Sequence, residues 1–95
     1  MAEPAPRIVY RVHAVQRMAE RGIREEDVAR AATEGKEIES YPDDEPYPSR
    51  LLLGSAEGRP IHVVTARAEH EIIVITVYEP DPALWEPGFE RRRKP

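Results

Sequence analysis

One histidine and two arginines recur at intervals of four residues near the start of the chain. His13, Arg17 and Arg21 fall in a single stretch, HAVQRMAERGI. On an α-helix, residues four apart lie on one face, so these side chains would form a column. An imidazole titrates near neutral pH, and a guanidinium is a permanent cation whose donors fit phosphate. The column therefore predicts phosphate binding. The structural alternative is a solvated helix face with ordinary ion pairs.

A histidine and a tyrosine further along the chain, His62 and Tyr78, lie in β-prone segments. Metal-independent RNA cleavage needs a base for the 2′-hydroxyl, an acid for the departing 5′-oxygen and cations for the phosphate. The chain offers candidates for proton transfer (His13, His62, Tyr78) and for phosphate or RNA binding (Arg17, Arg21, Arg50). The structural alternative for His62 and Tyr78 is a packed pair whose polar atoms are hydrogen-bonded within the protein.

Two short amphipathic helices are predicted to carry the N-terminal candidates, over residues 12–21 and 25–34. Their apolar positions fall on single stripes, and Gly22 stands where a left-handed C-cap ends the first helix. The second helix begins with three acidic residues, which complement its dipole but would repel phosphate. The pair is therefore not predicted to be a DNA-reading helix–turn–helix.

The remainder of the chain is β-rich. Strands are predicted near residues 37–41, 50–56, 60–67 and 71–78, with turns near 57–59 and 68–70, and a separate β-prone segment at 8–10 precedes the helices. The segment at 8–10 is short and suits a sheet edge. We therefore predict an α+β domain in which two N-terminal helices pack on an antiparallel sheet of three to four strands.

Alternation along the last strand assigns its side chains to two faces. Ile73, Ile75 and Val77 would point one way, and Tyr78 the other, together with Ile72, Val74 and Thr76. The cleaner apolar rows are expected under the helices. His62, Thr76 and Tyr78 could then converge on the second face.

Composition favours one small domain of 95 residues, with 40% hydrophobic and 34% charged residues. We expect a disordered lead-in at 1–7, a domain at 8–90 and a basic tail at 91–95. The absence of cysteine excludes disulfides and thiolate zinc sites, and the histidine spacing does not predict a metal or cofactor. No apolar run reaches ~20 residues, and no export signal begins the chain, so a cytoplasmic location without membrane partners is expected.

The net charge of −4 argues against non-specific coating of nucleic acid. The charge is uneven, however, because bases concentrate near residues 11–21 and in the tail. Acids at Asp43, Asp44 and Glu45 lie between prolines. This loop could dock a basic partner, or it could be simply solvated.

Three stretches, at residues 13–23, 41–50 and 75–82 with Trp85, together resemble a bacterial domain-of-unknown-function family, number 4258. Residues 58–64 share the likeness, which covers about 8–92. Arg24 departs from the resemblance, since Ser or Thr is the usual helix N-cap there. The resemblance implies a place in the broad RelE/ParE-like toxin group and its fold. It also implies a toxin-like, metal-independent endoribonuclease that acts on RNA and is paired with an antitoxin protein.

A different class of function fits the same chain. The edge strand near 8–10 or 37–41, or the acidic loop, would serve a non-catalytic protein-interaction module, because an exposed edge can accept a partner strand. The oligomeric state, monomer or homodimer, is left open.

Overall fold

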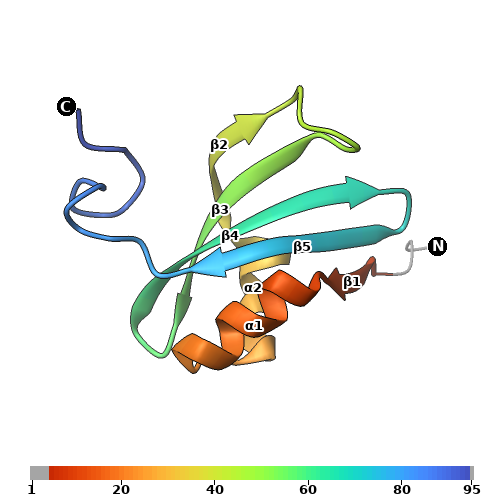
Figure 1. Ribbon diagram of the computed structural model, residues 1–95, viewed down its shortest axis with the longest axis horizontal. Helices are drawn as coiled ribbons and strands as arrows, with labels where there is room; N and C mark the ends of the chain where they lie inside the picture. Colours follow the sequence, from red (N-terminus) through yellow and green to blue (C-terminus); the bar gives the residue numbers. More distant parts are fainter. Residues whose placement is uncertain (1–4, 95) are drawn as a thin grey trace.

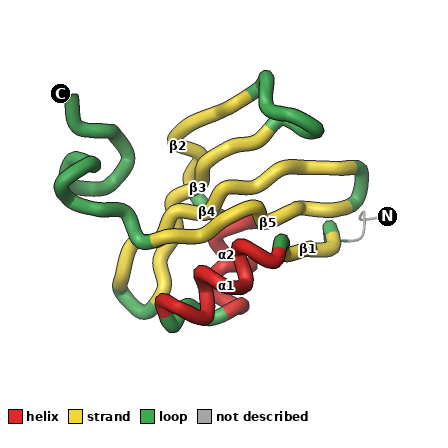
Figure 2. Tube along the Cα trace, viewed as in Figure 1, coloured by secondary structure: helices red, strands yellow, loops and turns green. Residues whose placement is uncertain are grey.

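Two helices pack against one face of a five-stranded mixed sheet (Figures 1 and 2). The computed structural model describes residues 5–94. In chain order, the elements are β1 (Arg7–Tyr10), α1 (Val12–Arg21), α2 (Glu25–Glu34), β2 (Lys36–Tyr41), β3 (Ser49–Ala56), β4 (Arg59–Ala68) and β5 (Glu71–Tyr78). Helix α1 packs mainly on β5, and α2 packs mainly on β3. An α+β domain with two N-terminal helices is therefore confirmed.

Both helices begin and end where the sequence predicts. Gly22 follows α1 with φ 63°, in the left-handed region that favours glycine, and the Ile23 N–H donates to the Met18 carbonyl at 2.9 Å. Gly35 ends α2 for a different reason. Its backbone is extended, but a Cβ there would collide with the Ala31 carbonyl and approach the Leu53 carbonyl to 2.9 Å. Glycine is needed at this position for space.

The sheet has the strand order β1-β5-β4-β3-β2, and β1 runs parallel to β5. The other neighbours are antiparallel. The prediction of a purely antiparallel sheet with three to four strands is therefore wrong in both strand number and direction. Side-chain patterning indicates that residues 8–10 form a strand, but it does not reveal which strand they join. Here the partner is the last strand, more than sixty residues along the chain.

A β-bulge changes which face of the sheet the side chains of β5 point to. Val64 is opposite Thr76, whereas Thr65 is opposite Val74, so Ile75 is an extra residue in the ladder. Val77 consequently shares the helix-covered face with Val74, and the strict alternation predicted for this strand is wrong. The bulge leaves His62 directly opposite Tyr78.

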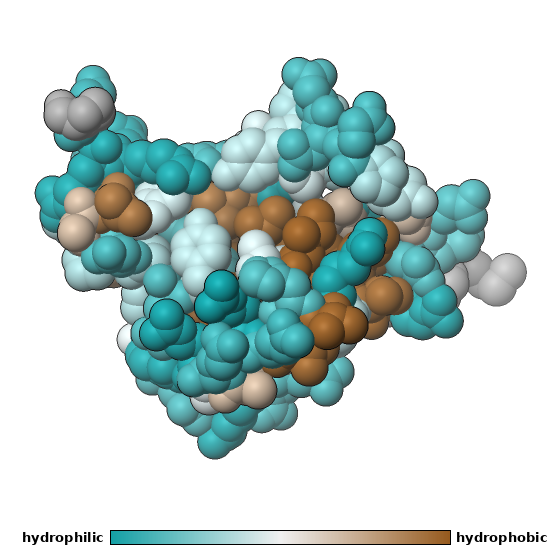
Figure 3. Space-filling model, viewed as in Figure 1, coloured by the Kyte–Doolittle hydropathy of each residue, from teal (hydrophilic) through white to brown (hydrophobic). Residues whose placement is uncertain are grey.

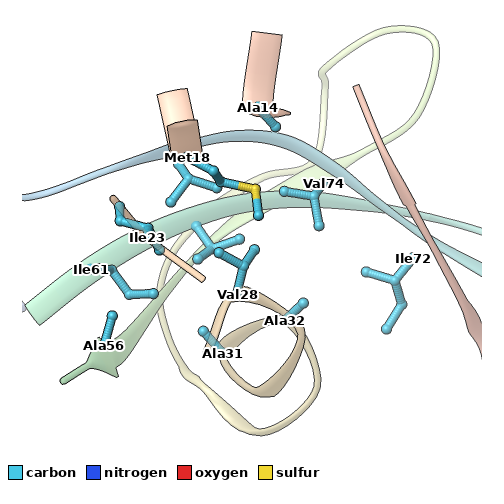
Figure 4. Packing of buried hydrophobic residues seen from close by; sticks show 12 residues of the cluster. Ala14, Met18, Ile23, Val28, Ala31, Ala32, Ala56, Ile61, Ile72 and Val74 are labelled. Atoms are coloured by element: carbon cyan, nitrogen blue, oxygen red, sulfur yellow. The ribbon is translucent and has the colours of Figure 1, made fainter. Parts of the chain in front are cut away.

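The apolar core lies between the helices and the sheet (Figure 4). Met18 of α1 extends toward Val74 of β5, and Val28 of α2 belongs to the same buried cluster. Full burial of a side chain such as Val28 stabilises the fold by roughly 1.5–3 kcal/mol. The cluster comprises Ala14, Met18, Ile23, Val28, Ala31, Ala32, Ala56, Ile61, Val63, Ile72, Val74 and Val77.

The C-terminal segment, residues 79–94, curls beyond the end of β5 (Figure 1, blue) and contacts β2 and β4 through side chains. The Arg93 N–H donates to the Leu84 carbonyl, and the Glu86 N–H donates to the Arg91 carbonyl, both at 2.8 Å. Residues 91–93 are therefore paired with residues 84–86 in a hairpin-like turn. At the other end, β1 already begins at Arg7, while residues 1–4 of the predicted lead-in lie outside the described residues.

Within the described part of the chain, neither helix is long and apolar enough to span a membrane.

Candidate functional site

His62 lies on the sheet face opposite the helices, because its neighbours in β4, Ile61 and Val63, belong to the core beneath them. The side chain is fully buried. Nε2 lies 2.8 Å from the Phe89 carbonyl oxygen, which only accepts, so Nε2 carries the proton. Nδ1, 3.2 Å from the Tyr78 hydroxyl, then accepts from it. Burial lowers the pKa of His62 below its ordinary value, so the imidazole is neutral at pH 7 and its unprotonated Nδ1 accepts from the Tyr78 hydroxyl.

Trp85 of the C-terminal segment contacts both His62 and Arg92. The indole meets the imidazole edge-on, with ring centroids 4.4 Å apart and an interplanar angle of 85°. The Arg92 guanidinium carbon lies 4.7 Å from the centre of the indole ring. An aromatic ring attracts a cation over its face, so Trp85 helps to fix the position of Arg92.

Strand β2 contributes a carboxylate and a phenol. Arg92 donates from Nε to Glu39 Oε2 at 2.8 Å and from Nη2 to Oε1 at 3.1 Å, which is a two-pronged contact. The Tyr41 hydroxyl donates to the same carboxylate. The Arg92 hydrogen bonds hold the pKa of Glu39 below its usual value, and Glu39 raises that of Arg92.

These residues form one cluster, called here the sheet-face cluster: Glu39, Tyr41, His62, Tyr78, Trp85 and Arg92. Burial also raises the pKa values of Tyr41 and Tyr78. The pKa values of all five ionisable members of this cluster are displaced from their ordinary values. Such convergence is typical of catalytic sites, where environments are arranged to set protonation states.

The members of the cluster differ in how far they are exposed to solvent. The Arg92 side chain is 58% exposed and the Glu39 side chain 25% exposed, whereas His62 is sealed beneath Trp85 and Phe89. A ligand can therefore reach the charged pair at the surface. His62 is fully buried, and both of its ring nitrogens face protein groups.

The predicted residues His13, Arg17 and Arg21 do share α1 and are exposed, but they lie on the helix side of the sheet. Arg17 pairs with Glu20 at 3.2 Å. Arg50 lies on β3, outside both α1 and the sheet-face cluster, and forms an ion pair with Glu37 at 3.4 Å. Of the six predicted site residues, only His62 and Tyr78 therefore belong to the sheet-face cluster, whereas His13, Arg17 and Arg21 share the separate helix α1.

Sequence reasoning missed Glu39, Tyr41 and Arg92. Alternation does place Glu39 and Tyr41 on one face of a strand, which is the only signal they carry. Arg92 lies in a stretch that reads as a loose basic tail, and nothing in the pattern links it to residue 39. Their meeting depends on the path of the C-terminal segment across the sheet.

No group of three His, Asp or Glu residues that could hold a metal occurs within residues 5–94. In the acidic loop, Asp44 accepts a hydrogen bond from the Ser49 hydroxyl. That contact ties the loop to the start of β3, so Asp44 has a structural role there.

A family model described as Domain of unknown function (DUF4258) matches residues 10–79, well over half of the chain. The match includes Glu39, Tyr41, His62 and Tyr78, whereas Trp85 and Arg92 lie beyond it. No curated protein and no solved structure matches the chain.

Proposed function

We propose that this chain, which belongs to the family described as Domain of unknown function (DUF4258), is a toxin-like, metal-independent endoribonuclease acting at the sheet-face cluster. A RelE/ParE-like fold and an antitoxin protein that keeps the enzyme silent are parts of the same proposal. The observation that carries it is the exposed Arg92–Glu39 fork, which lies beside the His62–Tyr78 pair on one face of the sheet.

Each chemical requirement of RNA cleavage has a candidate in the cluster. The Glu39 carboxylate, kept ionised by Arg92, would take the proton of a ribose 2′-hydroxyl. That oxygen would then attack the adjacent phosphorus, forming a 2′,3′-cyclic phosphate and breaking the bond to the 5′-oxygen. Arg92 would turn its donors to the non-bridging phosphate oxygens, where negative charge accumulates.

Tyr78 would supply the proton to the departing 5′-oxygen. Burial raises its pKa, so the hydroxyl stays protonated at neutral pH. That hydroxyl donates its one proton to neutral His62 before the reaction, and it would turn the O–H from Nδ1 to the leaving oxygen as the bond breaks, with the phenol ring kept beside His62. His62 is accordingly a positioning residue in this proposal, and Tyr78 the acid.

Charge near the cluster suits an RNA substrate despite the overall net charge of −4. Arg91, Arg93 and Lys94 are exposed in the same segment that carries Arg92. A local excess of cations attracts phosphate even on an acidic protein.

The test is cleavage of a fluorescent single-stranded RNA by the purified chain in the presence of EDTA. We expect a product ending in a 2′,3′-cyclic phosphate, and we expect Glu39→Gln to slow its formation on the order of 100-fold or more, because the base is lost. Glu37→Gln is the matched control, since Glu37 lies on the same strand in an ion pair with Arg50. The absence of cleavage by the unmodified chain, or equal rates for Glu39→Gln, would overturn the proposal.

The alternative, a non-catalytic interaction module, is favoured by one observation. Both ring nitrogens of His62 are occupied by protein partners, and the side chain is fully buried. Such a cluster can simply anchor the C-terminal segment. Folded protein that leaves RNA intact would support this function.

A further inference from the structure

A small cavity opens on the helix-covered face of the sheet, at a corner beyond the area that α2 covers. It has a volume of about 270 Å³, and its lining comes from β2, β3, β4 and the connection between β2 and β3. The register explains this grouping, because Ser40 lies opposite Arg50, and Arg50 lies opposite Thr65. Thr65 in turn lies opposite Val74 of the core. Directly opposed residues share a face, so this row belongs to the face on which the helices pack.

Two arginines give the cavity a positive charge. Arg67 follows Thr65 by two positions on β4, so it points to the same face. Arg67 forms no ion pair with any carboxylate of residues 5–94. Arg50 pairs with Glu37 at 3.4 Å, longer than the roughly 2.7–2.9 Å typical of charge-assisted hydrogen bonds. Two guanidiniums and one carboxylate give the lining a net charge of +1, in a chain whose net charge is −4.

Residues with hydroxyl groups lie beside the two arginines. Thr65 lines the cavity and is only 1% exposed, so it forms the floor. Ser40 lines the cavity from β2 and is exposed. The connection between β2 and β3 borders the cavity through Pro48, and Figure 3 shows this connection as a hydrophilic projection at the top of the molecule. A polar rim and a charged lining suit an ion better than an apolar ligand.

We propose that this cavity, called here the corner cavity, binds a doubly charged phosphate group, as in inorganic phosphate or a phosphomonoester. A carboxylate has two oxygens and is matched by one guanidinium fork, whereas a phosphomonoester has three terminal oxygens and a charge of about −1.5 to −2 at pH 7. Arg50 and Arg67 would supply two forks, and the Thr65 hydroxyl would donate to the remaining oxygen. Glu37, whose side chain is 48% exposed, would turn to solvent as Arg50 moves to the ligand.

A larger concavity adjoins the corner cavity and leaves room for the rest of a ligand. Its volume is about 770 Å³, it shares Arg67 with the corner cavity, and it includes Tyr47, which is 41% exposed. Arg7 of this concavity is already paired with Glu71. An exposed aromatic ring can stack on a nucleobase. The phosphate group therefore has two possible sources, free phosphate and a nucleotide, with the same chemistry at the two arginines.

The corner cavity and the sheet-face cluster lie on opposite faces of the sheet. Glu37 is opposite Leu52 and Glu39 is opposite Leu51, and these neighbouring leucines of β3 point to different faces. A ligand in the cavity is thus separated by the sheet from Glu39 and Arg92. The inference consequently does not depend on the ribonuclease proposal, and Glu37→Gln still serves as the control for RNA cleavage.

The experiment follows the backbone amide signals of the isotope-labelled full chain by NMR during titration with inorganic phosphate. We expect saturable shifts in the residues that line the cavity. Arg50→Gln/Arg67→Gln should weaken binding about 10-fold or more, because two charge-assisted contacts are lost. Arg17→Gln/Arg21→Gln is the matched control, since it removes the same charge from exposed arginines of α1 and should leave the affinity unchanged.

Two single substitutions test the groups beside the arginines. Thr65→Val keeps the branched shape of the side chain but removes the hydroxyl, so it should weaken phosphate binding several-fold. Glu37→Gln should strengthen binding, because it releases Arg50 and removes the negative charge from the lining. The dispersed amide spectrum of each variant shows that it is folded.

Adenosine 5′-monophosphate and adenosine identify the source of the phosphate group. Tighter binding of the nucleotide than of inorganic phosphate, with the gain lost in Tyr47→Ala, would assign the site to a nucleotide. Equal binding of the two would assign it to free phosphate. Adenosine, which lacks the phosphate, should bind far more weakly than the nucleotide in either case.

Three results would overturn the inference. One is the absence of saturable shifts in the cavity, or an affinity for phosphate that Arg50→Gln/Arg67→Gln leaves unchanged. Another is an equally large loss in Arg17→Gln/Arg21→Gln, which would assign phosphate binding to general charge or to α1. The third is binding of adenosine as tight as that of its monophosphate. RNA cleavage is not measured in any of these titrations, so failure of this inference is distinct from failure of the ribonuclease proposal.

Discussion

At the scale of single residues, the protonation state of His62 is set by its partners. A carbonyl oxygen at Nε2 requires a proton there, and a tyrosine hydroxyl at Nδ1 can then act as donor. Burial opposes a second proton, so the pKa of His62 lies below its ordinary value. The folded chain thus binds fewer protons at this site than the unfolded chain does.

This difference predicts a pH dependence of stability. The depressed pKa contributes stability that is complete above the unfolded value of about 6.5 and is lost as pH falls through the folded pKa. Urea unfolding should therefore show a lower midpoint at pH 5 than at pH 7. His62→Gln should reduce that difference, whereas His70→Gln, in an exposed turn, should leave it unchanged. The same pH difference in His62→Gln as in the unmodified chain would refute this account. Glu39 does not interfere, because its lowered pKa acts below this window.

At the scale of elements, the two helices depend on two glycines for different physical reasons. Gly22 turns the chain between α1 and α2 in a left-handed conformation, with open space around the missing side chain. Gly35 has an ordinary backbone but no space, because α2 and β3 both crowd it. A side chain at residue 22 would strain the backbone, whereas a side chain at residue 35 would clash with neighbouring atoms.

Alanine substitutions should separate these two effects. Gly22→Ala is expected to lower the free energy of unfolding by about 1 kcal/mol, the cost of a left-handed alanine. Gly35→Ala should cost more, roughly 1–3 kcal/mol, because α2 must move away from β3. Chemical denaturation of the two variants measures both. A smaller loss of unfolding free energy for Gly35→Ala than for Gly22→Ala would show that α2 can move away from β3 at little cost.

At the scale of the whole molecule, the sheet lies between the two helices and the C-terminal segment. The helices cover one face, and the C-terminal segment crosses part of the other through Trp85, Phe89 and Arg92. A second ion pair, Lys36 with Glu90 at 2.6 Å, ties the same segment to β2. Loss of one attachment should therefore loosen the segment locally while the helix-covered core stays folded.

Trp85 is the chain's single tryptophan, and it reports on this attachment. Arg92→Ala removes both the fork to Glu39 and the cation over the indole. We expect red-shifted tryptophan emission and easier quenching by acrylamide, with global stability reduced by no more than about 1 kcal/mol, since the pair is partly exposed. Arg91→Ala is the matched control. Unchanged emission in Arg92→Ala would mean that Trp85 holds the segment without it.

The sequence by itself determined the two helices, the strand segments and the turns, because hydrophobic periodicity, glycine placement and first-turn acids are local signals. It also placed His62 and Tyr78 on strands that could meet. The parallel pairing of β1, the bulge at Ile75 and the contact of Arg92 with Glu39 were decided only in the tertiary structure. The first and the last of these bring together residues that are distant in the chain. The bulge changes which face of the sheet the following side chains of β5 point to. Such choices follow from competition among whole packing arrangements, which no short stretch of sequence encodes.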